Sequence, residues 1–413
     1  MLCRLIGAVV VVFAVASQSM GFEVGAIILK IDTENRMAVV LANGRERTVK
    51  IAANVEIQDG KGEDLSGGLA AKELKEGAVV TLTVERDGNM PAIVSIRLGG
   101  KVNPQTGPNV PRQASVGKSG VGFKPLTVMS AEDRYKGEAG GLYGGGKNEL
   151  PDALVAAATK VTAKIKPLDA DGNPAADGKI ALVSISMSNA TQEFSRFKRL
   201  AGADVRKSPL VAIVDCAQGG QTMARWADAK SACWKEADRR LKAAGVSRQQ
   251  VQVAWVKLAN AGPKGNLEEH GKRLERDTRI VLANLTEHFP NLRIAYLGSR
   301  IYGGWADGRL NPEPYAYEGA FVVRWLIQSQ MRANGGLNYD PDRGEVESPL
   351  LLWGPYFWAD GTTPRKSDGL TWQRSDLVGD GTHPSDTGRQ KVAEQLLKFF
   401  KNDVYARKWF VEE

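Results

Sequence analysis

The sequence predicts an α/β protein, in which a five-stranded parallel sheet forms a three-layer α/β/α sandwich behind a small all-β domain. Two observations lead to this prediction. From residue 178 onward, apolar runs alternate with helical segments, which is typical of a parallel sheet covered on both faces. Between residues 23 and 99, short β-rich runs are separated by turn sequences such as DTEN and DGN, which indicates a small barrel or sandwich.

The first residues have the pattern of a secretory signal peptide. Arg4 precedes an apolar run over residues 5–16, and Ala14-Val15-Ala16 fits the small-residue pattern of a cleavage site. A membrane-spanning helix needs about 20 apolar residues, and neither this run nor any later one reaches that length. We therefore predict a signal peptide over 1–16, a mature chain that begins near Ser17, a secreted or periplasmic protein, and no membrane contact after cleavage.

Composition narrows the class of protein. Charged residues at 25% and apolar residues at 43% are ordinary for a globular protein. The net charge of +8 is not concentrated in a basic run interleaved with aromatic residues, which argues against nucleic-acid binding. No cluster of His, Cys and carboxylate residues has the spacing of metal ligands, so we expect neither a metal nor an organic cofactor. The oligomeric state is not indicated.

Four segments follow the signal peptide. The small β-domain covers 23–99, and its role as a binding module, a spacer or an appendage stays open. Residues 100–150 are rich in Pro, Gly and Ser and read as a linker that ends in a glycine-rich loop. The α/β domain covers 151–402, and 403–413 is expected to be a C-terminal tail.

Each strand expected in the α/β domain is a short apolar run that precedes a helix. The strands are expected at 179–186, 209–217, 251–259, 292–299 and 349–357. The helices are expected around 191–200, 222–244, 267–288, 315–333 and 384–400. Ligand sites in such sheets lie beyond the carboxyl ends of the strands, so the residues that follow each strand are the candidates for function.

The cysteines allow two readings. Cys3 leaves with the signal peptide, and Cys216 and Cys233 remain. An even pair in an oxidising compartment fits a disulfide. Two buried free thiols are the alternative.

The segments that follow the strands supply the parts of a nucleophilic site. SMSN after the first strand contains Ser188, AQGGQT after the second contains Gly219 and Gly220, and KLANAG contains Lys257 and Asn260. GDGTHPSD after the last strand contains Asp380 and His383. A serine hydroxyl needs a neighbouring base, an imidazole supplies one, and an aspartate fixes the tautomer of that imidazole. Glycine N–H groups and an asparagine amide can bind a developing oxyanion.

His383 is the best candidate base among three histidines. His270 lies in a charged helical segment and His288 near a helix C-terminus, and a structural role suffices for both. His383 lies in a loop of small residues directly before Pro384, which is a favourable first residue of a helix. A helix-capping residue is the alternative for His383.

These segments resemble the blocks of the SGNH/GDSL hydrolase family, over roughly residues 125–402. DGTHPSDTGRQKVAEQL resembles the terminal Asp-x-x-His block and the helix after it, while SMSN, AQGGQT and KLANAG resemble the first three blocks. The resemblance implies a flavodoxin-like fold and a triad of Ser188, His383 and Asp380. It also implies an oxyanion hole that includes Gly220, or else Gly219, with Asn260. Ser184 and Ser186 would then be structural residues of the strand.

The sequence departs from the family pattern at two blocks. Ser186-Met187 stand where the family has Gly-Asp before the nucleophile. The third block lacks its Gly and its Asn-Asp pair, because Lys257 stands near the Gly position and only Asn260 remains. Asn260 is alternatively a polar residue that ends a strand. The segments LYGGGKNELP, SNATQEF, RIYGG and NPEPYAYE are also similar to secreted SGNH-like proteins of environmental bacteria.

Aromatic residues are frequent in the loops 300–318 and 353–372. Tyr302, Trp305 and Trp358 are candidate substrate-binding residues, because rigid amphipathic rings stack on sugar faces. Lys257 is a further candidate, as a contact for an anionic group. Core packing is the alternative for the aromatic residues.

We therefore expect a secreted serine esterase that acts on acylated carbohydrate or another small ester, with O-acetyl groups as the leading acyl group. A catalytically degenerate carbohydrate-binding or scaffold protein of the same fold is the main alternative. A thioesterase or peptidase with the same triad is another.

Overall fold

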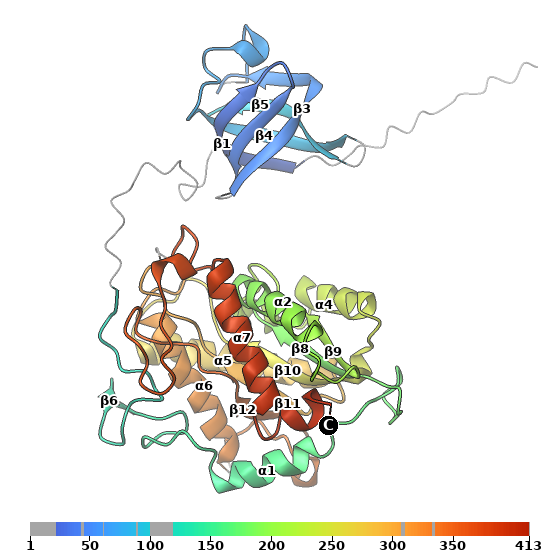
Figure 1. The fold of residues 1–413 in the computed structure, drawn as a ribbon, viewed down its shortest axis with the longest axis vertical. Helices are drawn as coiled ribbons and strands as arrows, with labels where there is room; N and C mark the ends of the chain where they lie inside the picture. The colour runs from blue at the N-terminus through green and yellow to red at the C-terminus, as the bar shows by residue number, and fades with distance from the viewer. Residues whose placement is uncertain are drawn as a thin grey trace, which may run out of the picture. The chain divides into compact units, whose positions relative to one another are not determined.

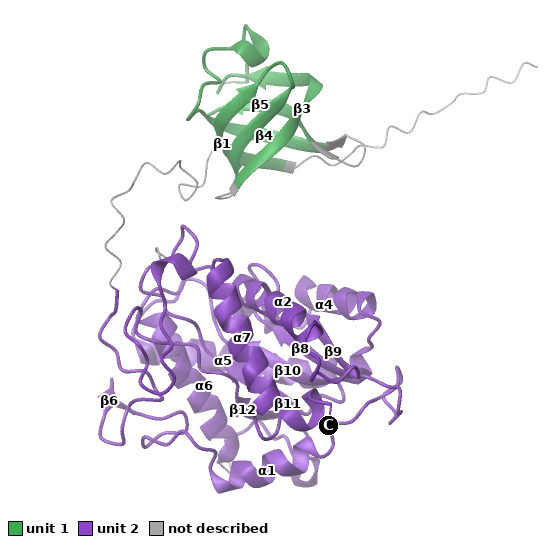
Figure 2. Ribbon diagram, viewed as in Figure 1, with its two compact units in different colours: residues 1–114 green, residues 115–413 purple. Residues whose placement is uncertain are grey.

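The computed structural model describes residues 22–42, 45–60, 62–87, 90–99, 119–306, 310–332 and 335–412. The chain divides into two compact units, residues 1–114 and 115–413, coloured separately in Figure 2. The predicted signal peptide lies outside the described residues. Within the described ranges, no helix is both long enough and apolar enough to cross a membrane.

The first unit contains a closed five-stranded barrel. Its strands are β1 (Phe22–Asp32), β2 (Met37–Ala42), β3 (Arg45–Gln58), β4 (Val79–Asp87) and β5 (Met90–Leu98), in the order β1-β2-β3-β5-β4. All neighbours are antiparallel except β3 and β5, which run parallel. Alternate side chains point inward, as in β2, and fill the barrel with residues such as Ile28, Ile51 and Leu82. Of the two architectures expected, the structure has the barrel.

The second unit is built on a five-stranded sheet in the order β12-β11-β10-β8-β9, with every pair parallel. The strands are β8 (Ile180–Ile185), β9 (Val211–Asp215), β10 (Val251–Lys257), β11 (Ile294–Gly298) and β12 (Leu350–Trp353). Every residue of β8, β10, β11 and β12 is buried, as expected for strands covered on both faces. The strand order is that of flavodoxin-type doubly wound sheets, whose ligand sites lie beyond the carboxyl ends of the strands.

Helices connect and cover the strands (Figure 1). They are α1 (Asp152–Thr162), α2 (Ser188–Gly202), α3 (Met223–Trp226), α4 (Ala232–Ala243), α5 (Leu267–His288), α6 (Tyr315–Met331), α7 (Asp386–Asn402) and α8 (Arg407–Phe410). Phe194 of α2 stacks on Trp255 of β10, and Phe197 of α2 meets Phe400 of α7 at 5.3 Å. Tyr296 of β11 also packs against Phe400, so α2 and α7 cover the same face of the sheet.

Several elements of the second unit differ from the sequence prediction. The helix expected at 222–244 is divided into α3 and α4, because the side chain of Asn284 on α5 donates to the carbonyl groups of Trp226 and Ala227 and so ends α3. The strand expected at 349–357 ends at Trp353. Helix α1 was not expected.

The segments on either side of the sheet domain pack onto it. The N–H groups of Val121 and Gly122 donate to the carboxylate of Asp360 at 2.6 and 2.9 Å, so the part of the expected linker that the structure describes belongs to the second unit. At the other end, the expected C-terminal tail is not free over residues 403–412, which the structure describes. Phe410 is fully buried, and its ring centroid lies 5.3 Å from that of Phe400.

Candidate active site

Ser188 lies at the turn between β8 and α2. Ser184 donates to Asp215 of β9 at 2.5 Å and Ser186 donates to the carbonyl oxygen of Lys257 of β10 at 2.5 Å, so both hydroxyls are bound to neighbouring strands. Ser188 is the first residue of α2 and is half-buried. The first N–H groups of a helix have no partner inside it and carry partial positive charge. Ser188 therefore combines an accessible hydroxyl with backbone donors.

His383 reaches Ser188 across the sheet edge. The imidazole Nε2 lies 2.7 Å from the Ser188 hydroxyl, and Nδ1 lies 2.6 Å from Oδ2 of Asp380. The Asn189 side chain donates to the carbonyl oxygen of Thr382 at 2.8 Å and so ties the start of α2 to the His383 loop. The structure thus brings Ser188, His383 and Asp380 into one hydrogen-bonded chain, in which the imidazole can accept the hydroxyl proton.

The Asp380 carboxylate is also held by its own loop. Its Oδ1 accepts from the N–H groups of Thr382 at 2.8 Å and His383 at 2.9 Å. Burial alone would raise the pKa of Asp380, but the hydrogen bonds from the His383 ring and from these N–H groups hold that pKa below its ordinary value. The carboxylate therefore stays ionised beside the ring. The site remains open to a substrate, since the side chains of His383 and Asp380 are 23% and 34% exposed.

A neighbouring loop fixes the position of the Asp380–His383 segment. Gly381 has a φ of +64°, and a Cβ placed there would lie 1.7 Å from the carbonyl oxygen of Trp305. The Thr382 hydroxyl donates to the carbonyl oxygen of Leu310 at 3.3 Å. The segment after β11 therefore packs directly against the segment that carries His383, and only glycine fits at the point of contact.

The glycines after β9 lie beside the end of β8. The N–H of Gln218 donates to the carbonyl oxygen of Ser186 at 3.0 Å, which fastens this loop two residues before Ser188. Gly219 and Gly220 are exposed, and Gly220 has a φ of +75°. Within the part of the chain that the structure describes, neither N–H donates to a backbone oxygen. Both donors are therefore free to meet a ligand at this edge.

Both the oxygen and the nitrogen of the Asn260 side-chain amide make hydrogen bonds within the protein. Its oxygen accepts from the N–H of Ala224 at 2.9 Å, and its nitrogen donates to Asp277 at 2.7 Å. These contacts join the loop after β10 to α3 and α5. One amide hydrogen is then left for another acceptor, and the placement of Asn260 in an oxyanion hole stays a prediction.

Lys257 does not face a substrate, which corrects the sequence prediction. Its side chain is 1% exposed, and its ammonium group donates to both carboxylate oxygens of Glu193. Burial lowers the pKa of Lys257 to about 8, while the Glu193 carboxylate acts in the opposite direction. The lysine is thus part of a buried ion pair between β10 and α2.

Two of the three aromatic candidates are core residues, which is a second correction. Tyr302 is 1% exposed and Trp358 is fully buried. The indole nitrogen of Trp358 donates to the carboxyl group of Glu313 at 2.8 Å. Trp305 is half-buried and packs edge-on against Tyr302, with ring centroids 4.8 Å apart. Core packing therefore explains Tyr302 and Trp358, and only Trp305 remains near the surface of the site.

Two supporting residues were missed by the sequence reasoning. Asn189 directly follows Ser188, and this adjacency was the available signal. Glu313 has no such signal, because its role depends on the fold. Its carboxyl group accepts from the N–H of Gly303 at 2.8 Å, from Tyr317 at 3.0 Å and from Trp358. Burial raises the pKa of Glu313 to about 7. Glu313 thereby holds the loop that supports Gly381.

Cys216 and Cys233 are separate buried thiols rather than a disulfide, so the alternative reading is the one the structure has. Burial raises the pKa of both thiols, and the nearby Asp215 carboxylate adds to the effect at Cys216. Among the described residues, no group of three or more His, Cys, Asp or Glu side chains has the geometry of a metal site.

Comparisons with known proteins return only distant structural likenesses. No protein family's sequence model and no curated protein matches the chain. The periplasmic domain of the lipopolysaccharide acetyltransferase of Salmonella ser. Paratyphi A is similar at 14% identity, with 62% of this chain and 98% of that chain covered and a TM-score of 0.30. Apo-CusF from Escherichia coli is similar at 13% identity, with 22% of this chain and 100% of that chain covered and a TM-score of 0.16.

Proposed function

We propose that the protein is an exported serine esterase of the SGNH type, in which Ser188 is the nucleophile, His383 the general base and Asp380 the group that orients the base. The observation that supports this most strongly is the continuous hydrogen-bonded chain from the Ser188 hydroxyl through both nitrogens of His383 to Asp380. Along the sequence, Ser188 follows the first strand of the sheet, β8, whereas His383 and Asp380 follow the last strand, β12. A hydroxyl, an imidazole and an ionised carboxylate in this order form the arrangement that activates serine for acyl transfer.

The reaction would proceed in two steps. His383 takes the proton of Ser188 as the hydroxyl oxygen attacks the ester carbonyl, and the imidazolium then returns that proton to the departing alcohol. Water attacks the resulting acyl-serine, His383 takes one proton from the water, and the carboxylic acid leaves while Ser188 is regenerated. The N–H groups of Ser188 and Gly220 would stabilise the oxyanion in both steps, with Asn260 as a third donor.

The proposed substrate is an ester on a carbohydrate, with O-acetyl groups as the leading acyl group. Trp305 supports this, because it is a partly exposed aromatic ring on the loop that contacts Gly381. The proposed place of action is outside the cytoplasm, on the evidence of the signal-peptide pattern over 1–16.

A fluorophosphonate probe tests the nucleophile. We expect labelling of the wild type and none of Ser188→Ala, with strong loss in His383→Ala. Hydrolysis of p-nitrophenyl acetate should follow the same order. Acetylated xylan and an acyl thioester then identify the ester class, and an added sugar acceptor separates hydrolysis from transfer of the acyl group to a hydroxyl.

Two outcomes would count against the esterase. Labelling that persists in Ser188→Ala would assign the reactivity to another residue. A wild type that neither reacts with the probe nor releases acetate, yet binds polysaccharide, would favour the catalytically degenerate binding protein.

A further inference from the structure

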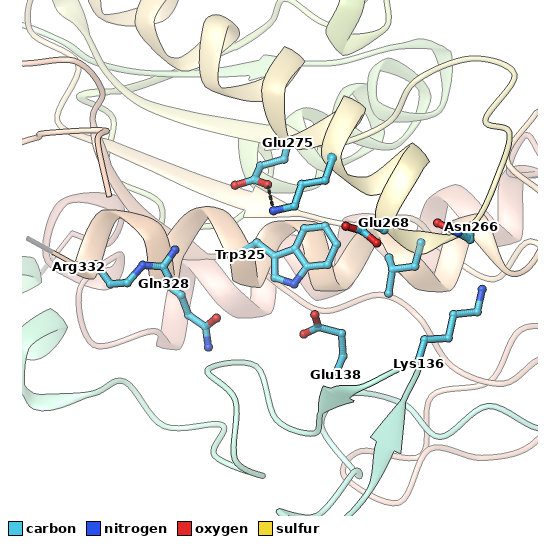
Figure 3. Close-up of a pocket in the computed structure, with 10 residues that line it drawn as sticks. Lys136, Glu138, Asn266, Glu268, Glu275, Trp325, Gln328 and Arg332 are labelled. Carbon is cyan, nitrogen blue, oxygen red and sulfur yellow. Dashed lines mark hydrogen bonds and ion pairs between the residues drawn. The ribbon is translucent and has the colours of Figure 1, made fainter. Parts of the chain in front are cut away.

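The second unit has a pocket that does not include the triad. It lies between α5, α6 and the hairpin formed by β6 (Arg134–Tyr135) and β7 (Glu138–Ala139), as Figure 3 shows. Its volume is about 520 Å³, within the range of small-ligand sites. Ser188, His383 and Asp380 are not among its lining residues. The pocket is therefore a separate feature of the fold.

An indole ring occupies the centre of the pocket wall. Trp325 on α6 is half-buried, and Figure 3 shows its ring between side chains of α5 and the hairpin. Its six-membered ring rests on α5 at Gly271, where an added Cβ would come within 2.8 Å of it. The ammonium group of Lys272 lies 4.9 Å from the ring centroid. The indole is thus fixed in place before any ligand arrives, which lowers the entropic cost of binding.

Several polar side chains around the indole are also fixed in place, in their case by ion pairs with neighbouring residues. Lys136 donates to Glu318 at 2.7 Å, Glu138 pairs with Arg324, and Lys272 pairs with Glu275 at 3.0 Å. The formal charges of the lining residues cancel, since the positive side chains are Lys136, Lys272 and Arg332 and the negative ones are Glu138, Glu268 and Glu275. A pocket of zero net charge with many hydrogen-bonding groups does not select a strongly charged ligand.

The carboxylate of Glu268 is available to bind a ligand in this pocket. Glu268 is exposed on the first turn of α5, and its carboxylate has no hydrogen-bond or ion-pair partner among the residues that the structure describes. Figure 3 places it beside Trp325, on the side of α5 that faces the pocket. A carboxylate next to an aromatic ring can accept hydrogen bonds from hydroxyl groups while the ring contacts the apolar face of the same ligand.

We propose that this pocket binds a neutral saccharide, with one pyranose ring against Trp325 and its hydroxyl groups on Glu268 and the other polar side chains. A neutral sugar ring has the apolar faces and the hydroxyl-rich rim that this pocket matches. That the bound sugar belongs to the polymer whose esters are cleaved rests on the proposed function. Binding itself does not.

Calorimetric titration of the full chain with xylohexaose tests the proposal, and because this oligosaccharide carries no ester, the heat reports binding alone. Trp325→Ala should weaken binding about tenfold or more. Glu268→Ala should weaken it measurably, and Glu287→Ala, the same change at an exposed site near the other end of α5, should leave it unchanged. Hydrolysis of p-nitrophenyl acetate by Trp325→Ala with Ser188 intact should equal that of the wild type.

The outcomes separate the two proposals. Absence of binding, equal affinity of Glu268→Ala and Glu287→Ala, or equal affinity of a folded Trp325→Ala would overturn the saccharide pocket. Tighter binding of an anionic oligogalacturonate than of xylohexaose would overturn its neutral selectivity. If Trp325→Ala does not fold, the Glu268 and Glu287 pair decides. The esterase proposal depends only on the Ser188 and His383 experiments. Failure of the saccharide pocket would therefore not count against the esterase, and failure of the esterase would not count against saccharide binding.

Discussion

Asp380 accepts two hydrogen bonds from its own loop and one from the His383 ring, so its carboxylate is fixed independently of the substrate. Asp380→Asn keeps the size of the side chain but removes the charge and favours the wrong imidazole tautomer. We expect kcat for p-nitrophenyl acetate to fall by about 10⁴ while KM changes little. Steady-state kinetics on a variant with an unchanged circular dichroism spectrum measure this. A fall of less than tenfold would remove Asp380 from the proposed triad.

The Lys257–Glu193 pair leads to a stability prediction. Both side chains are at most 1% exposed, so removal of Lys257 leaves the buried Glu193 carboxylate without its hydrogen-bonded partner. We expect Lys257→Met to lower the free energy of unfolding by about 3–5 kcal/mol. The double variant Lys257→Met with Glu193→Leu should recover much of that loss. Urea unfolding measures both, and a double variant no more stable than the single one would contradict this account.

At the residue scale, the apolar run of the first strand was enough to place Ser184 within β8 and Ser188 past its end, at the start of α2. The resemblance of SMSN to the first SGNH block then singled out Ser188 as the candidate nucleophile. Lys257 could not be assigned in this way, because its partner Glu193 lies on a helix that the sequence places but does not orient. The prediction that Tyr302 and Trp358 bind substrate was wrong for the same reason, because the burial of a loop residue depends on which segments pack over it.

At the scale of the element, the loop that carries His383 allows a matched pair of substitutions. Gly381→Ala introduces a Cβ against the carbonyl oxygen of Trp305 at a positive φ, whereas a Cβ at Gly379 meets nothing within 4 Å. We expect Gly381→Ala to lower kcat at least tenfold by displacing His383, because small misplacements of a catalytic group are costly. Gly379→Ala should retain wild-type kcat. Equal rates for the two variants would show that the Trp305 contact does not position His383.

Glu313 makes the support of this loop depend on pH. Its pKa is raised from 4.5 to about 7 in the folded chain, so the folded state binds more protons than the unfolded state between these values. The protonated Glu313 side chain therefore makes its full contribution to the free energy of unfolding below pH 4.5, and this contribution is lost as the pH rises to about 7. Relative to the wild type, Glu313→Gln should become steadily more stable over this interval and keep a constant difference above it. Thermal unfolding of both proteins at several pH values measures the difference, and a difference independent of pH would contradict it.

Elements were predictable where local signals mark their ends. Helix α5 begins and ends where expected, because Asn266 and Glu269 form a capping box at its start. The break between α3 and α4 was not predictable, since it depends on Asn284 from a distant helix. Helix α8 was missed because its burial depends on contacts with α7.

At the scale of the whole molecule, the two units have separate hydrophobic cores that share no residue. We therefore expect two unfolding transitions in differential scanning calorimetry. Ile51→Ala removes a fully buried side chain of the barrel and should destabilise that unit by about 2–5 kcal/mol. The transition of the second unit and the hydrolysis of p-nitrophenyl acetate should not change. A single transition that moves as a whole would show that the units unfold together.

The general architecture was predictable because continuous apolar runs followed by helices leave few arrangements other than a parallel sheet. The described strands agree with that expectation. What the pattern could not supply was the extent of the second unit, since the segments 119–150 and 403–412 join it through contacts such as that of Asp360 with Val121.

The unlinked state of Cys216 and Cys233 has a practical consequence. A chain whose native form contains no cross-link between these residues needs no oxidant, isomerase or shuffling buffer to reach that form. Recombinant protein should therefore fold in a reducing bacterial cytoplasm, and the purified protein should tolerate dithiothreitol without a fall in its melting temperature.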